Sequence, residues 1–125
     1  MRTATSDFIG QALSVLCVIH CVATPIVLAL APAAMGVFGG AHPVLLVLVF
    51  ATAAWAFVPG YRHHKQTGPL ALAAAGMGLL ALGAFVFHGN LVLDTTASVA
   101  GAGLMLFAHW KNRSAHKQHC HACEA

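Results

Sequence analysis

The sequence predicts an all-α membrane protein with four transmembrane helices, both termini on the cytoplasmic side and a short His/Cys-rich tail. Of its 125 residues, 59% are hydrophobic and 7% are charged, whereas an average soluble domain is about 45–50% apolar and about 25% charged. Three long stretches carry no charge, namely those between Asp7 and Arg62, between Lys65 and Asp94, and between Asp94 and Lys111. Because a helix that spans a bilayer needs about 20 apolar residues, these stretches exclude soluble enzymes, nucleic-acid-binding proteins and disordered tails.

Breaks in the apolar pattern divide these stretches into four helices. Gly39 and Gly40, followed by Pro43, separate the first two helices, since proline is tolerated in the first turn of a helix. Pro69 opens the third helix after a polar loop, and the turn at 88–90 separates the third helix from the fourth. The predicted organisation is a transmembrane domain of residues 1–110, with helices at about 8–38, 42–61, 69–87 and 91–110, and a tail of residues 111–125.

The basic residues predict the orientation of these helices. An even number of spans places both termini on one side of the membrane, and all six Lys and Arg residues then fall on that side. Because basic residues in short loops mark the cytoplasmic face, we expect both termini to be cytoplasmic. A cleaved signal peptide is the competing interpretation, since residues 29–34 resemble a processing site. A signal peptide begins with a positively charged region, and here that region has only Arg2, whose charge is opposed by Asp7.

A polar stripe interrupts the first predicted helix. Residues three or four apart share one face of a helix, so Cys17, His20, Cys21 and Thr24 lie together on an otherwise aliphatic segment. Pro25 has no N–H, which leaves the carbonyl of Cys21 without its usual helical donor. A free carbonyl in a bilayer favours a packed or hydrated interior, and we therefore expect the stripe to face inward near the middle of the membrane.

This stripe has the chemistry of a site for a soft metal ion. Thiolates select soft metals, and two thiolates cancel the charge of a divalent ion, which is costly when unpaired at the bilayer centre. We expect Cys17 and Cys21 to be the ligands, with His20 accepting the thiol protons or acting as a third ligand. Cysteine also packs as a small hydrophobe, but an ionisable His20 on the same stripe favours the functional interpretation.

The tail carries a second cluster of metal-binding residue types. Cys120 and Cys123 form a C-x-x-C pair, and histidines lie around it at His116, His119 and His121. Such Cys/His-rich tracts are typical of metal binding, although C-x-x-C is also a redox spacing. Cytoplasmic thiols stay reduced, and nothing nearby would be folded by a structural zinc ion, so we expect the tail to bind a transported metal.

Several weaker signals have simpler interpretations. We expect His42, His88 and Asp94 to be solvated at the outer face rather than to bind a divalent cation, and His109 to be an interfacial anchor beside Trp110. Small residues favour close helix packing or a homodimer; they are Gly76, Gly78, Gly83, Ala97, Gly101 and Gly103.

Taken together, the stretch 16–25 and the tail pair resemble the MerC-type mercury resistance membrane proteins over nearly the whole chain. The resemblance implies a four-helix carrier in the bacterial inner membrane, without catalytic activity or a permanently bound cofactor. Hg(II) would bind Cys17 and Cys21, pass to Cys120 and Cys123, and then reach a cytosolic mercuric reductase. His20 departs from the founding members of the family, and it would also suit zinc or copper(I).

Two other classes of function fit parts of the sequence. A membrane thiol–disulfide oxidoreductase that passes electrons to quinone also has four spans and two cysteine pairs. Such an enzyme needs reactive thiols at the outer face, however, and the predicted topology places none there. Cysteines four residues apart in a helix also have poor geometry for a disulfide. A sensor or metal chaperone would hold metal in the tail without any flux across the membrane. We favour the transporter, which moves the ion by exchange between thiolates.

Overall fold

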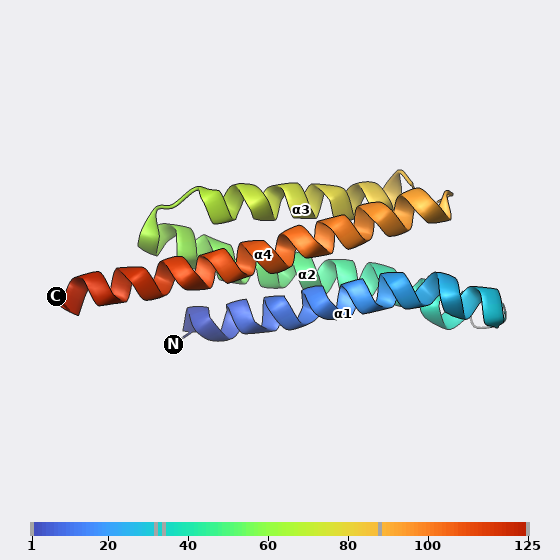
Figure 1. Ribbon diagram of the computed structural model, residues 1–125, viewed down its shortest axis with the longest axis horizontal. Helices are drawn as coiled ribbons and strands as arrows, with labels where there is room; N and C mark the ends of the chain where they lie inside the picture. The colour runs from blue at the N-terminus through green and yellow to red at the C-terminus, as the bar shows by residue number, and fades with distance from the viewer. Residues whose placement is uncertain (1, 32, 34, 88, 125) are drawn as a thin grey trace.

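The computed structural model describes the backbone of residues 2–31, 33, 35–87 and 89–124, and the side chains of residues 5–24, 26–27, 30–31, 33, 43–63, 65–87 and 89–115. The chain forms four consecutive helices that pack as an up-and-down bundle, with both termini at the same end (Figure 1). Their bounds are α1 Arg2–Leu30, α2 Met35–His64, α3 Gly68–Phe85 and α4 Leu91–Glu124. Each helix contains an apolar segment long enough to cross a membrane, which confirms the prediction of an all-α protein with four membrane-spanning helices.

The break between the first two helices lies earlier in the chain than we predicted. The first helix ends at Leu30 instead of continuing over 8–38, because Pro32 disfavours a helical conformation at the residue before it. Pro43, which we predicted at the start of a helix, lies inside α2 together with Pro59. Proline is tolerated inside transmembrane helices, where neighbouring groups satisfy the carbonyls that it leaves free.

The other two connections follow the prediction closely. Pro69 lies in the first turn of α3, and the Asn90 side-chain oxygen accepts a hydrogen bond from the backbone N–H of Leu93 at 3.2 Å, which caps the start of α4. The fourth helix does not end near residue 110, however. It continues to Glu124, so the backbone of the predicted tail is a direct extension of α4.

The fourth helix contacts all three others, and among the described residues α1 and α3 do not touch. The contact between α3 and α4 is close because two glycines face each other. A Cβ atom on Gly76 would lie 2.9 Å from the carbonyl oxygen of Gly101, and one on Gly101 would lie 2.8 Å from that of Gly76. The predicted small-residue packing is confirmed for this pair. Gly78 and Gly103 make no such close contact with the described residues, because Cβ atoms added to them would meet nothing within 4 Å, and a role for them in a homodimer stays a prediction.

This difference gives a matched test of the helix contact. Gly101→Ala forces two backbones apart, and we expect it to lower the free energy of unfolding by about 1–3 kcal/mol. Gly103→Ala, two residues away on the same helix, should leave stability unchanged or raise it by up to about 1 kcal/mol through helix propensity. Circular dichroism during unfolding in sodium dodecyl sulfate measures both values. Equal effects of the two substitutions would contradict the close contact.

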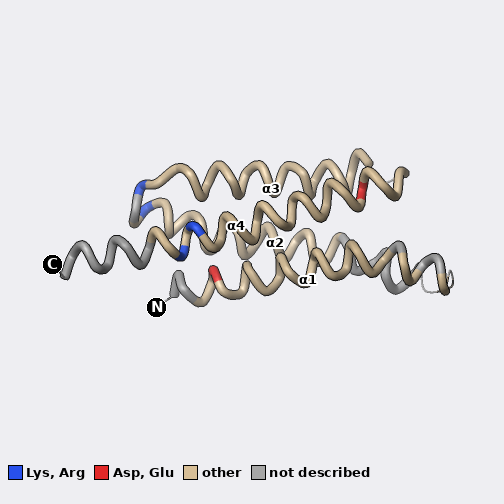
Figure 2. Tube along the Cα trace, viewed as in Figure 1, with Lys and Arg blue, Asp and Glu red and all other residues tan. Residues whose placement is uncertain are grey.

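The outer faces of the bundle are apolar, and its mainly apolar interior also contains a smaller number of polar side chains. Large exposed hydrophobic side chains cover its outer faces, as at Leu30, Phe85 and Val92, which suits contact with lipid. The buried polar side chains of the described residues all belong to α1 or α4, and they are Ser6, Asp7, Ser14, Ser98, His109 and Asn112. The described Lys and Arg residues lie at the end of the bundle that carries the termini (Figure 2).

Candidate metal site

Two cysteines lie side by side in the middle of α1. Cys17 and Cys21 are each 5% exposed, both are free thiols, and their Sγ atoms are 4.0 Å apart. They face inward because positions four apart meet on one helix face, and they belong to the same apolar core as Ala53, Ala102 and Met105. The predicted inward-facing thiol pair is therefore present in the structure.

The separation of the two sulfur atoms is close to what a shared metal ion requires. With metal–sulfur bonds of about 2.3 Å, a linear site needs a sulfur–sulfur distance of about 4.6 Å, and the observed 4.0 Å corresponds to a bent site. Small side-chain rotations would connect the two geometries. The described residues contain no group of three His, Cys, Asp or Glu side chains that could hold a metal ion, so the two thiols stand as a pair and His20 does not complete a three-ligand cluster with them.

A small pocket with several polar side chains in its wall adjoins one of the two thiols. It has a volume of about 40 Å³ and lies between α1 and α4, where its polar lining is formed by His20, Cys21, Thr24, Asp94, Thr95 and Ser98. The Thr24 hydroxyl donates to the His20 carbonyl at 2.6 Å. A water molecule needs about 10–15 Å³ of such space, so the pocket can admit a small hydrated group beside Cys21.

Asp94 differs from our expectation of a solvated residue. It is partly buried in the wall of this pocket, and its Oδ1 atom accepts a hydrogen bond from the Ser98 hydroxyl at 3.2 Å. Gly83 of α3 makes room for both groups, because a Cβ atom there would come within 2.7 Å of the Ser98 Oγ and 3.1 Å of the Asp94 Oδ1. The other two outer-face histidines, His42 and His88, lie outside the described side chains.

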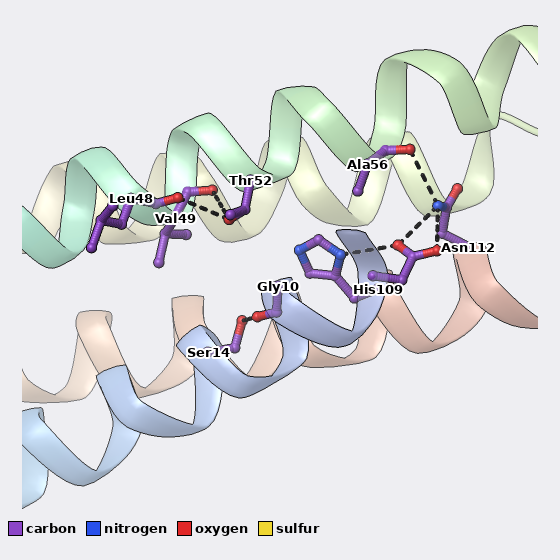
Figure 3. A network of polar contacts seen from close by, with 9 residues as sticks. Gly10, Ser14, Leu48, Val49, Thr52, Ala56, His109 and Asn112 are labelled. Atoms are coloured by element: carbon purple, nitrogen blue, oxygen red, sulfur yellow. Dashed lines mark hydrogen bonds and ion pairs between the residues drawn. The ribbon is translucent and has the colours of Figure 1, made fainter. Parts of the chain in front are cut away.

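A second polar cluster, which the sequence analysis missed, joins α1, α4 and α2 near the termini. His109 is 1% exposed and Asp7 is fully buried. The His109 Nδ1 lies 3.1 Å from an Asp7 oxygen, and the Asn112 Nδ2 donates to both Asp7 oxygens at 3.0 Å. The same amide lies 3.4 Å from the carbonyl oxygen of Ala56 in α2 (Figure 3). The prediction of His109 as an interfacial anchor is therefore wrong, because its ring packs inside the bundle, 4.6 Å from that of Phe57.

In this cluster, which we call the Asp7 network, the buried carboxyl group of Asp7 is shared by His109, which approaches it through its ring Nδ1 atom, and by the amide of Asn112. The Nε2 atom is buried without a hydrogen-bond partner. Two glycines make the space for this cluster: a Cβ atom on Gly10 would collide with the His109 ring, and one on Gly60 would lie 2.5 Å from Asn112 Oδ1.

One pattern in the sequence could have revealed the Asp7 network. Asp7, Gly10, Ser14, Cys17 and Cys21 recur at spacings of three and four, which is the period of a buried helix face. All five residues are buried, so the polar stripe is longer than we predicted. It extends from the thiol pair to the end of the bundle that carries the termini.

The tail residues of the predicted second site cannot be placed in the same way. The side chains of His116, His119, Cys120, His121 and Cys123 lie outside the described residues. The backbone there is helical to Glu124. Position 120 comes 22 residues after Ser98 in α4, which corresponds to about 33 Å along a helix axis.

The fold and the site together define a small four-helix membrane protein that buries a pair of thiols between its helices. The family model described as the MerC mercury resistance protein matches residues 7–114. The chain therefore belongs to the MerC family, a family of membrane transport proteins associated with mercury resistance. Comparisons with curated proteins and with solved structures found no match.

Proposed function

We propose that this protein carries Hg(II) across the bacterial inner membrane into the cytoplasm, with Cys17 and Cys21 as its membrane site. The observation that carries the proposal is the buried thiol pair, with 4.0 Å between its sulfur atoms. Binding removes one proton from each thiol, so the complex of the dication with two thiolates is neutral. A neutral complex avoids the cost of a charge at the bilayer centre, which is a few to more than ten kcal/mol.

The number of ligands among the described residues bears on the choice of metal. Zinc in proteins almost always has four ligands or three ligands and a water, and the described residues offer no group of three around the thiols. A pair of thiolates suits an ion that is stable with two soft ligands, such as Hg(II) or copper(I). Membership of the mercury resistance family favours Hg(II) over copper(I).

The distribution of charge supports the proposed direction of transport. The described basic residues lie at the end that carries the termini (Figure 2), and basic residues mark the cytoplasmic face. The ion would enter from the opposite end and leave toward the tail, where Cys120 and Cys123 would receive it by thiolate exchange. A cytosolic mercuric reductase would then accept the ion. Because the two pairs are separated along the bundle, the handover needs a movement of the tail or of the helices.

A metal competition experiment on the purified protein tests this function. The Cys120→Ser/Cys123→Ser variant keeps only two of the four cysteines, and it is titrated with equimolar Hg(II), copper(I) and Zn(II) and examined by native mass spectrometry. We expect one Hg(II) per chain with the loss of two protons, and no displacement of Hg(II) by Zn(II).

The matched control carries Cys17→Ser and Cys21→Ser in the same background, and it should bind no Hg(II) in the membrane domain. Hg(II) binding by this control at the level of the two-thiol protein would refute the proposed site. If copper(I) displaced Hg(II), the result would indicate that copper(I), and not Hg(II), is the substrate of the membrane site.

A further inference from the structure

The pocket beside Cys21 brings other polar groups close to the thiol pair. It is bounded by a carboxylate, an imidazole-bearing residue, hydroxyl groups and one of the two thiols. The pocket adjoins Cys21, whereas Cys17 lies one helical turn nearer to the end that carries the termini. An ion that arrives through the pocket therefore meets Cys21 first.

The charge of this region favours a cation. Asp94 lies in the first turn of α4, where the helix dipole stabilises a negative charge. The described Lys and Arg residues all lie at the opposite end of the bundle (Figure 2), so none of them neutralises Asp94. Its carboxylate is held in the pocket wall by Ser98, and a charged cleft with low-dielectric walls concentrates ions of the opposite sign.

The pocket does not chelate an ion permanently. The described residues contain no group of three His, Cys, Asp or Glu side chains that could hold a metal ion. Weak binding is what a loading position requires, because an ion that is held tightly cannot move on. Hard carboxylate and hydroxyl oxygens also bind a soft metal ion less strongly than the thiolates beyond them.

We propose that the Asp94 pocket is a loading site that attracts a hydrated divalent cation and delivers it first to Cys21 and then to Cys17. This inference rests on the proposed function, since it gives the order in which the same thiol pair is filled. As the bond between the metal and Cys21 Sγ forms, the ion loses one water, and the thiol proton leaves on that water as hydronium. Formation of the bond to Cys17 releases a second water and a second proton in the same way.

Two substitutions separate the charge of the pocket from its shape. Asp94→Asn removes the charge at nearly constant volume. Gly83→Ala keeps the charge but places a methyl group against Asp94 and Ser98. Gly78→Ala, on the same helix but with nothing within 4 Å of its added Cβ, is the matched control. All variants are made in the Cys120→Ser/Cys123→Ser background and reconstituted in lipid vesicles.

The experiment measures the rate at which Cys21 reacts with a cationic and with a neutral thiol reagent of similar size, together with the rate of Hg(II) loading followed by its thiolate absorbance. We expect Asp94→Asn to slow the cationic reagent and Hg(II) by about tenfold at low salt, with a smaller effect at high salt. The neutral reagent should react at the wild-type rate. Gly83→Ala should slow all three probes, and Gly78→Ala none.

The results that would refute the loading site differ from the result that would refute the proposed function. If Asp94→Asn leaves Hg(II) loading at the wild-type rate, or slows the neutral reagent equally, the loading site is refuted while the thiol pair stands. If Cys17 reacts before Cys21, the proposed order is wrong. Wild-type Hg(II) binding in the Cys17→Ser/Cys21→Ser variant would instead refute the proposed function itself.

Discussion

Uptake of radioactive Hg(II) by cells that express the Cys17→Ser variant is expected to fall to the level of cells without the protein. With one thiolate missing, the complex in the middle of the membrane keeps a net positive charge. A charge at that depth costs at least about 3 kcal/mol, which corresponds to a more than hundredfold loss in rate or affinity. Whole-cell uptake of ²⁰³Hg measures the effect, and uptake of ⁶⁵Zn under the same conditions tests the choice of metal.

Ser14→Ala is the control for this substitution. Ser14 is buried on the same face of α1, and its hydroxyl donates to the carbonyl of Gly10 at 2.8 Å within the helix. Its removal should leave uptake unchanged, provided that immunoblotting shows equal amounts of both variants in the membrane. Uptake by Cys17→Ser at the wild-type rate would show that the ion crosses without the thiol pair.

Replacement of Asp7 with alanine is expected to cause the largest loss of stability among single changes in the Asp7 network. The substitution leaves the buried Nδ1 atom of His109 and the buried amide of Asn112 without their shared partner. Removal of one partner of a buried ion pair costs about 3–5 kcal/mol in soluble proteins, while a single interhelical hydrogen bond in a membrane protein averages about 0.6 kcal/mol. Because two polar groups lose their partner at once, we expect a loss of about 2–4 kcal/mol.

Unfolding in sodium dodecyl sulfate, followed by circular dichroism, measures this loss. Asp7→Asn is the control, since it keeps the size of the side chain and one oxygen acceptor, and it should cost less than half as much. The double variant Asp7→Ala/His109→Ala tests the pairing directly. If the two single effects simply add in the double variant, His109 and Asp7 do not interact and the network is not the contact between α1 and α4 that we describe.

The parts of this structure that depend on local sequence could be predicted. Long uncharged stretches define the four spans because hydrocarbon excludes charge, and the thiol pair follows from a spacing of four on one helix. The first interhelical break could not be placed, because Pro32 and Pro43 are both credible breakers, and Pro43 lies inside α2. Sequence alone does not show which proline a transmembrane helix tolerates.

The parts of the structure that depend on contacts between distant segments could not be predicted from the sequence. Asp7 and His109 are separated by 102 positions, and each alone has the features of a residue at the membrane interface. Only the packing of α1 on α4 shows that they meet in a buried site. Asp94 was misjudged for the same reason, since its burial depends on Gly83 of a neighbouring helix.

The placement of both thiols on one turn of α1 has a thermodynamic consequence. A ligand shifts a conformational equilibrium only when its affinity differs between the two states. Cys17 and Cys21 belong to the same helix, so their geometry is unchanged by any movement that carries α1 as a unit. The geometry of the pair therefore gives metal binding no preference between such arrangements. For the transport that we propose, the direction of net flux would then be set by the acceptor that removes the ion in the cytosol.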